Sequence, residues 1–516
     1  MPDIVLCAIN ARYIHSSLAL RSLHANLGVL RERATILEVI TAQRGVDIAE
    51  MLLALQPKII GISVAIWNAQ LSLELVQLLR ALAPEVVVVL GGPEVSHELH
   101  GRRIVELANY VIAGEGEVAF RELCEALLAG DAPAEKVIVA KPPDLSHLEL
   151  PYGLYDDEDI AQRVIYVEAS RGCPFGCTFC LSALDPGVRY FPEEQLFGAF
   201  SSLLERGARR FKFVDRTFNL NTRRAVRLLD FFSGRREKDL FVHLEAVPQR
   251  LPEPLVEALK RFGPGQVQLE LGVQSLDTQT LERIGIRRNR QQVLRNIERL
   301  AVLGVHCHAD LIGGLPGESL DTFAQGFDRL WETGVNEIQL GILKRLYGAP
   351  ISGEPSSQGL LFAEHPPYEV LRSDAMTFET LAQLKRVAHL WDRVGNSGNF
   401  TSMLPLVEKD RSIFWGLWEL TGWVFAHEGR VHSIALDRLA VLLGDYLVEE
   451  RGLERASIAS MLIDEYRRAG RKLPKALRPF AAGVGGALAP QASAESGADC
   501  AALPSRQARH RKGRGG

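Results

Sequence analysis

Residues 164–180 read VIYVEASRGCPFGCTFC, an apolar run rich in β-branched residues followed by a loop that holds three cysteines. These are Cys173, Cys177 and Cys180, with two glycines and a proline in the same loop. Glycine adopts backbone angles closed to other residues and proline fixes one of its own, so the segment predicts a tight loop. We therefore expect a strand that is followed, at its carboxyl end, by a loop whose three sulfur atoms bind one small group.

The downstream sequence repeats the strand pattern of this run. Apolar, β-branched segments alternate with stretches of helical period from residue 161 to residue 350. The predicted strands are Val164–Ala169, Arg210–Val214, Phe241–Ala246, Val267–Leu271, His306–Leu311 and Glu337–Leu343. Six βα units favour a barrel-type parallel sheet that stays partly open, since eight units would close it. The cysteine loop follows the first strand, so it is expected at the mouth of this partial (βα)6 barrel.

The upstream sequence, residues 1–130, shows the same alternation with different turns. Its predicted strands are Ile4–Ile9, Ala34–Ile40, Ile59–Ile66, Val86–Leu90 and Tyr110–Ala113. Continuous apolar strands between helices predict an α/β domain of the doubly wound Rossmann type. Such folds bind ligands at the carboxyl ends of their strands. The polar and glycine-rich turns at those ends contain His15, Ser63, Gly91, Gly92, Gly114 and Glu115.

The remaining segments differ in composition. Residues 131–160 are acidic and rich in proline, which predicts a linker. Residues 368–478 show helical periodicity and hardly any strand signal, which predicts a C-terminal α-helical domain over residues 351–482. The aromatic stripe over residues 414–425 is expected to be core. Residues 483–516 are rich in Ala, Gly and Ser and end in ARHRKGRGG, which predicts a disordered basic tail.

Composition excludes several classes of protein. The 516 residues carry 59 Lys and Arg against 63 Asp and Glu, so there is no electrostatic case for nucleic-acid binding. Seven cysteines are too sparse for a disulfide scaffold. The N-terminus lacks the basic start of a signal peptide, and the longest apolar runs fall short of the ~20 residues that span a membrane. A cytoplasmic protein with reduced thiols is expected.

The spacing of the three cysteines, C-x3-C-x2-C, narrows their chemistry. A structural zinc site would need a fourth ligand, and no Cys or His pair lies nearby. A disulfide would leave one thiol over and is disfavoured in a reducing compartment. Closely spaced thiolates are typical ligands of iron–sulfur clusters. Three thiolates on a four-iron cluster leave one iron open for another ligand.

With Phe179 before its last cysteine, this segment resembles the signature of radical S-adenosylmethionine (SAM) enzymes. The resemblance implies a [4Fe–4S] cluster on Cys173, Cys177 and Cys180, with SAM on the open iron and reductive cleavage to a 5′-deoxyadenosyl radical. Segments 243–245, 270–275 and 310–318 resemble later strand ends of the same family. They imply three side chains that bind the ribose and methionine parts of SAM and a glycine that lets the backbone approach the adenine: Glu245, Glu270, Gln274 and Gly313.

The N-terminal turns at residues 61–63, 90–94 and 113–117 resemble the cobalamin-binding domains of B12-dependent radical SAM enzymes. The resemblance implies that their glycines let the corrin and its nucleotide tail lie close to the strand ends. The D-x-H-x-x-G motif that supplies a histidine ligand in other B12 proteins is absent. His15 is therefore expected in a non-ligand polar role, either beneath the corrin or capping the first helix together with Ser16.

Residues 10–21 resemble a bacterial subgroup of these enzymes. Its members join a B12-binding domain, a radical SAM barrel and a helical domain of unknown function, and the resemblance covers residues 1–480. The implied reaction is methyl transfer to an unactivated carbon or phosphorus of a small molecule or peptide. A flavodoxin- or ferredoxin-type donor would supply electrons. Two alternatives stay open: an oxidoreductase or ring-forming enzyme without methyl transfer, and a non-enzymatic Fe–S sensor. A methylthiotransferase would need three N-terminal cysteines, and only Cys7 and Cys124 are present there.

Overall fold

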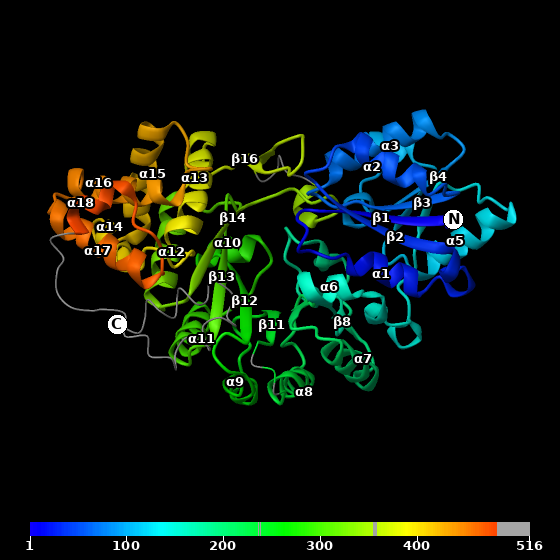
Figure 1. The fold of residues 1–516 in the computed structure, drawn as a ribbon, viewed down its shortest axis with the longest axis horizontal. Coiled ribbons are helices and arrows are strands. Elements are labelled where there is room, and N and C mark those ends of the chain that lie inside the picture. Colours follow the sequence, from blue (N-terminus) through cyan, green and yellow to red (C-terminus); the bar gives the residue numbers. More distant parts are fainter. Residues whose placement is uncertain (236, 238, 354–358, 482–516) are drawn as a thin grey trace. The chain divides into compact units, whose positions relative to one another are not determined.

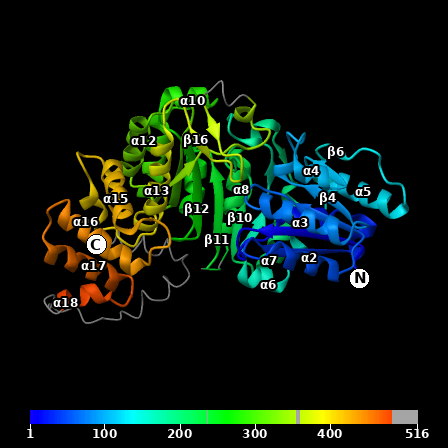
Figure 2. The same cartoon turned by 90° about the horizontal axis from the view of Figure 1, so that it is seen from above.

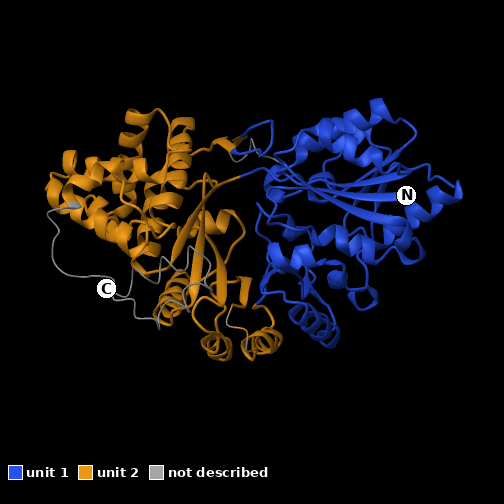
Figure 3. Cartoon of the chain, viewed as in Figure 1, with its two compact units in different colours: residues 1–218, 344–355, 362–369 blue, residues 219–343, 356–361, 370–516 orange. Residues whose placement is uncertain are grey.

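The computed structural model describes residues 1–235, 237, 239–353 and 359–481. The predicted tail lies outside these residues. The chain forms two compact units (Figure 3). The first comprises residues 1–218, 344–355 and 362–369, and the second comprises residues 219–343, 356–361 and 370–516. The cysteine loop therefore belongs to the same unit as the N-terminal sheet.

The N-terminal sheet has six parallel strands in the order β2-β1-β3-β4-β5-β6 (Figure 1). Its strands are β1 (Ile4–Asn10), β2 (Ala34–Ile40), β3 (Ile59–Ser63), β4 (Val87–Gly91), β5 (Tyr110–Ala113) and β6 (Val137–Val139). The doubly wound fold is thus confirmed. The sequence predicted five strands, whereas β6 lies in the segment predicted as a linker. Three residues at the edge of a sheet make too short an apolar run to stand out from their surroundings.

Helices cover both faces of this sheet. Successive side chains of a strand point to opposite faces, so apolar strands need a helical layer on each face. The helices are α1 (Leu18–Ala25), α2 (Gly45–Ala54), α3 (Ala69–Leu82), α4 (Arg103–Leu107) and α5 (Glu117–Ala129). Along β1, Cys7 faces the core that α2 and α3 cover, whereas its neighbour Leu6 faces the core shared with α1 and α5. Cys124 of α5 lies in that second core, so the two N-terminal cysteines are buried on opposite faces.

The first unit continues into the predicted barrel. Its further elements are α6 (Asp157–Gln162), β7 (Ile165–Val167), β8 (Ser170–Arg171), β9 (Arg189–Tyr190), α7 (Glu193–Glu205) and β10 (Arg210–Phe213). Strands β7 and β10 pair in parallel, and Phe200 of α7 packs edge-on against Phe213 of β10. The short antiparallel pair of β8 and β9 frames the cysteine loop.

The second unit holds the other four predicted strands, so all six are present. They are β11 (Phe241–Ala246), β12 (Val267–Gln274), β13 (His306–Gly313) and β14 (Glu337–Ile342), which pair in chain order and in parallel. Helices between and beside them are α8 (Thr222–Ser233), α9 (Glu253–Lys260), α10 (Thr278–Arg283), α11 (Arg290–Val302) and α12 (Leu320–Glu332). Buried and half-buried residues alternate strictly along β12, so every second side chain points away from the apolar core.

The C-terminal part of this unit is helical, as predicted (Figure 2). It contains α13 (Phe378–Val394), α14 (Leu404–Val407), α15 (Ile413–Glu428), α16 (Leu436–Glu449), α17 (Arg455–Arg468) and α18 (Arg478–Ala481). Two short strands that the sequence analysis did not predict, β15 (Leu361–Phe362) and β16 (Val370–Arg372), precede them. Phe414 of α15 is fully buried and packs against Phe327. None of the described helices combines the length and apolar character needed to cross a bilayer.

Candidate functional site

The cysteine loop is constrained at both ends. Cys173 is buried, and Cys177 and Cys180 are partly exposed. Gly172 has a φ of 90°, and a Cβ there would overlap the carbonyl of Gly187, so only glycine fits this turn. The Cys173 amide donates to the Asp185 carbonyl at 2.9 Å. Three thiols on one short, fixed loop at the end of β7 suit a cluster that three closely spaced thiolates hold.

Asp215, which follows β10, supports the strand that leads into this loop. Its carboxylate accepts hydrogen bonds from the Ala169 amide at 2.9 Å and from the Ser170 hydroxyl. The side chain is buried, and this burial raises the pKa of Asp215 to about 6 in spite of those bonds. Its part here is to hold residues 169 and 170 in place.

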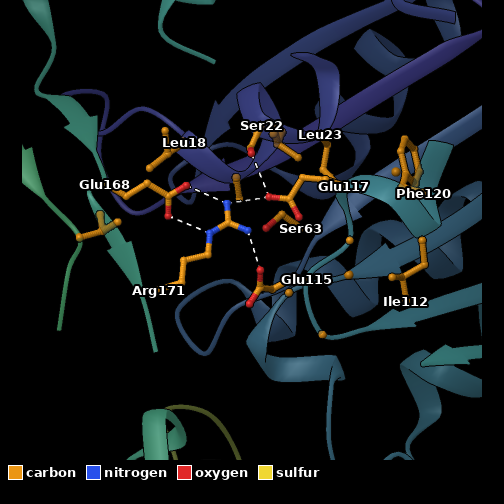
Figure 4. Close-up of a pocket in the computed structure, with 18 of the residues that line it drawn as sticks. Leu18, Ser22, Leu23, Ser63, Ile112, Glu115, Glu117, Phe120, Glu168 and Arg171 are labelled. Atoms are coloured by element: carbon orange, nitrogen blue, oxygen red, sulfur yellow. Dashed lines mark hydrogen bonds and ion pairs between the residues drawn. The ribbon is translucent and has the colours of Figure 1, made fainter. Parts of the chain in front are cut away.

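A cavity of about 620 Å³ opens at the carboxyl ends of β3, β4 and β5 (Figure 4). The first turn of α1 and the start of the cysteine loop complete its wall. Five residues predicted to bind cobalamin line it: Ser63, Gly91, Gly92, Gly114 and Glu115. Gly61 and Gly116 line it as well. A wall built so largely of glycine exposes backbone, which suits the close approach of a large cofactor at this edge of a doubly wound sheet.

Gly92 shows why glycine is needed in that wall. Its φ is 105°, and a Cβ at this position would lie 2.5 Å from the Val64 carbonyl oxygen. The turn after β4 therefore packs directly on the end of β3, and it leaves no room for a side chain. The Val64 amide donates to the Gly91 carbonyl at 2.8 Å, which fixes the two strand ends together.

Arg171 forms a charged centre on the same wall (Figure 4). Its guanidinium contacts three carboxylates, each at 2.7 Å, from Glu115, Glu117 and Glu168. Burial alone would lower the pKa of Arg171, but the carboxylates of Glu168 and Glu117 raise it. Burial raises the pKa of Glu168, and Arg171 only partly offsets this. Sequence reasoning missed this cluster as a site, although Arg171 and Glu117 lie inside the two segments that it singled out.

His15 lies outside the set of described residues that line the cavity. Its Nδ1 is 2.7 Å from the Tyr166 hydroxyl, and burial lowers its pKa. The cap of α1 is Ser17, whose hydroxyl accepts from the Leu20 amide. Ser16 instead donates to the Val164 carbonyl. The expectation that His15 and Ser16 cap the first helix is therefore wrong, because the helix begins one residue later.

The residues predicted to bind SAM from later strands lie in the second unit. Glu245 and Glu270 occupy paired positions on β11 and β12. Glu270 Oε2 lies 3.1 Å from His243 Nε2. Gln274 has a φ of 70° at an irregularity that ends β12. A Cβ on Gly313 would overlap the Leu384 side chain, so the packing of α13 on β13 also requires this glycine. Phe179 lies half-buried in the cysteine loop of the first unit.

Three family models match the chain in succession. The B12 binding domain matches residues 4–124, the radical SAM superfamily matches residues 167–330, and a family of unknown function, DUF4080, matches residues 357–472. The chain therefore contains, in order, a B12-binding domain, a radical SAM domain and a DUF4080 domain, which confirms the resemblance seen in the sequence. The matched domains imply a [4Fe–4S] cluster, SAM and cobalamin as cofactors.

Two similar proteins are described as methyltransferases. An uncharacterized methyltransferase of Pyrococcus horikoshii is 28% identical over 300 residues, 53% of this chain and 64% of that protein. The cobalamin-dependent radical SAM methyltransferase TokK of Streptomyces tokunonensis is 27% identical over 325 residues, 56% of this chain and 47% of that protein. The chain thus spans about half to just under two thirds of these relatives.

The fold is also similar to that of a solved structure, over a larger part of the chain. That structure is the cobalamin-dependent S-adenosylmethionine radical enzyme OxsB with aqua-cobalamin bound. It matches with a TM-score of 0.61 at 14% identity and covers 93% of this chain and 84% of its own. At this identity the match speaks for the fold alone.

Proposed function

We propose that this chain is a cobalamin-dependent radical SAM methyltransferase that acts on an unactivated carbon or phosphorus atom of a small molecule or peptide. One observation carries the proposal. Arg171, two residues before Cys173, lines the cavity of the B12-binding domain and pairs with Glu115 of that domain. This ion pair joins the loop that suits the cluster to the turns that suit cobalamin. The closeness of the two loops supports a reaction that uses both cofactors.

The chain's own task is to hold and orient these groups. Cys173, Cys177 and Cys180 would hold the cluster, with Phe179 beside the last thiolate. Glu245, Glu270, Gln274 and Gly313 are proposed contacts of SAM. Ser63, Gly91, Gly92, Gly114 and Glu115 are proposed contacts of cobalamin. Bound together, the cluster and SAM supply a hydrogen-abstracting radical, and cobalamin supplies the methyl group. Leu18, Leu23 and Phe120 line the cavity and would exclude water from the cofactor.

The proposed reaction needs a reductant for the cluster and for cobalamin. We propose a flavodoxin- or ferredoxin-type donor, and with it a cytoplasmic setting that keeps the three thiols reduced. The proposal disfavours a methylthiotransferase with a second cluster on N-terminal cysteines. Cys7 and Cys124 are buried on opposite faces of the sheet, and burial raises the pKa of both thiols to about 12. Neither is available as a thiolate ligand.

The test is reductive SAM cleavage by anaerobically reconstituted protein. The full chain is loaded with iron, sulfide and cobalamin, then supplied with SAM and dithionite, and 5′-deoxyadenosine, S-adenosylhomocysteine and methylcobalamin are quantified. The wild type should form 5′-deoxyadenosine and methylate its cobalamin. Cys177→Ala should form neither, while Cys307→Ala, which changes a buried thiol of β13, should behave as the wild type.

The same assay separates the competing functions. A sensor would carry the cluster, visible in its EPR spectrum, and yield no 5′-deoxyadenosine. An oxidoreductase or ring-forming enzyme would yield 5′-deoxyadenosine without transferring the methyl group of SAM. Either result from fully loaded wild-type protein would overturn the proposed methyl transfer.

A further inference from the structure

Three neighbouring strands of the second unit bring two histidines and a carboxylate together. His243 of β11, Glu270 of β12 and His308 of β13 each offer one ligand atom, and these atoms all lie within 4.8 Å of one another. His243 Nε2 is 3.1 Å and His308 Nε2 is 3.6 Å from the same oxygen, Oε2 of Glu270. The two imidazole rings meet edge to face with their centroids 5.6 Å apart.

His308 is the unusual member of this group. The residue is 8% exposed, and its Nε2 atom has no hydrogen-bond partner. That atom faces Oε2 of Glu270 and Oδ1 of Asp310, both 3.6 Å away, which is too far for a hydrogen bond. A buried ring nitrogen left in this way lowers the stability of the fold. A group that bridges the nitrogen and the carboxylate would remove that loss.

The distances fit a metal ion between the three side chains. Zinc lies about 2.0–2.2 Å from imidazole nitrogen and carboxylate oxygen, so two ligand atoms of a tetrahedral site are about 3.3–3.5 Å apart. The two distances to Glu270, 3.1 and 3.6 Å, bracket this range. We propose that His243, Glu270 and His308 bind a divalent cation of the zinc type, with the fourth position open as in catalytic sites of this ligand set. The carboxylate ligand is Oε2 of Glu270, so only the other oxygen of Glu270 is left for the SAM contact proposed above.

Gln268 supports the assignment from the opposite side of the His308 ring. Its side-chain amide lies 3.1 Å from His308 Nδ1. The nitrogen and oxygen of an amide have nearly the same shape, so a half-turn presents the oxygen to Nδ1. The Nδ1–H group then donates to Gln268, and the lone pair of Nε2 points at the cation. Metal-bound histidines are commonly oriented in this way by a neighbouring acceptor.

A nearby pair shows the ordinary alternative. His306, two residues earlier on β13, has its Nε2 2.9 Å from Glu337 Oε1, a normal hydrogen-bond distance. Both side chains of that pair are 6% exposed. His306 therefore needs no third partner, and it provides a matched control for His308.

The experiment measures metal binding by the full chain. Cys173, Cys177 and Cys180 are replaced by serine together, so that the iron–sulfur ligands do not contribute, and Co²⁺ is added anaerobically while its d–d absorption is recorded. One equivalent should bind and be displaced by Zn²⁺. His308→Gln and Glu270→Gln should each lose this equivalent, whereas His306→Gln should keep it. Gln268→Met should weaken binding about 10–100-fold.

Two results would overturn the site. One is the absence of stoichiometric Co²⁺ uptake by protein whose circular dichroism is native. The other is binding by Glu270→Gln equal to that of His306→Gln; because Glu270→Gln keeps the shape of the side chain, this comparison decides even if His308→Gln fails to fold. The readout is metal stoichiometry in protein without a cluster, so the outcome does not depend on SAM cleavage or methyl transfer.

Discussion

Arg171 Nη1 lies 2.7 Å from Glu115 Oε2, although the two residues are 56 positions apart in the chain. One residue comes from the B12-binding domain and the other from the start of the cysteine loop. Glu117 and Glu168 complete a shell of carboxylates around the same guanidinium. A single side chain thus joins the cysteine loop, the proposed site of the cluster, to the wall of the proposed cobalamin cavity.

Replacing Arg171 should lower the free energy of unfolding. Arg171→Met leaves three partly buried carboxylates without their cation, and loss of one partner of a buried ion pair costs about 3–5 kcal/mol. We expect a comparable fall in the free energy of unfolding, measured by urea denaturation, and weaker cobalamin binding. Arg44→Met breaks an exposed ion pair with Asp47 and should cost less than about 1 kcal/mol. Equal effects of the two substitutions would contradict the assigned role of Arg171.

Gly92 offers a test of the cobalamin cavity. Gly92→Ala combines a positive φ with an overlap on the Val64 carbonyl, whereas Gly101→Ala has a positive φ of 72° and no atom within 4 Å of its new Cβ. The difference between the two variants isolates the overlap, which we expect to cost about 1–3 kcal/mol. Cobalamin affinity, followed by the absorption of the corrin, should fall for Gly92→Ala alone. If Gly101→Ala loses cobalamin to the same degree, the assigned cavity is wrong.

Glu318 should make stability depend on pH. Burial raises its pKa to about 8 from an ordinary value of 4.5, against the opposing hydrogen bond from Ser275 at 2.5 Å. The folded protein therefore binds more protons than the unfolded chain between about pH 4.5 and pH 8, and this contribution to stability falls as pH rises through that window. Glu318→Gln removes the effect.

The free energy of unfolding of Glu318→Gln, measured by urea denaturation, should therefore rise relative to that of the wild type from about pH 5 to about pH 8 and level off above, with a final difference of about 2 kcal/mol or more. Glu282→Gln, on an exposed face of α10, should follow the wild type throughout. A constant difference between Glu318→Gln and the wild type across this pH range would refute the raised pKa.

Local sequence pattern predicted most of the fold. β2, β5 and β11 begin and end at the predicted residues, because each is a full apolar or alternating run between clear turns. β6 was not predicted, because an edge strand of three residues pairs on one side only and buries little apolar surface. The cysteines and glycine turns were visible because their chemistry depends on neighbours in the chain.

The charged cluster around Arg171 and the proposed metal ligands each combine residues that lie far apart in the sequence. Arg171 meets Glu115 and Glu117 through the tertiary fold, and nothing local marks that pairing. The alternation of β12 suggests that Glu270 points away from the apolar core. Only the register of three parallel strands, however, sets it beside His243 and His308.

The burial of the other cysteines gives the protein a selective reactivity toward alkylating agents. Cys7, Cys124 and Cys307 are at most 1% exposed, whereas Cys177 and Cys180 are partly open to solvent. Among the cysteines that the structure describes, a reagent such as iodoacetamide would therefore modify the loop first, and a bound cluster would shield it. The extent of alkylation at this loop, read by mass spectrometry, would then report the fraction of molecules that carry the cluster.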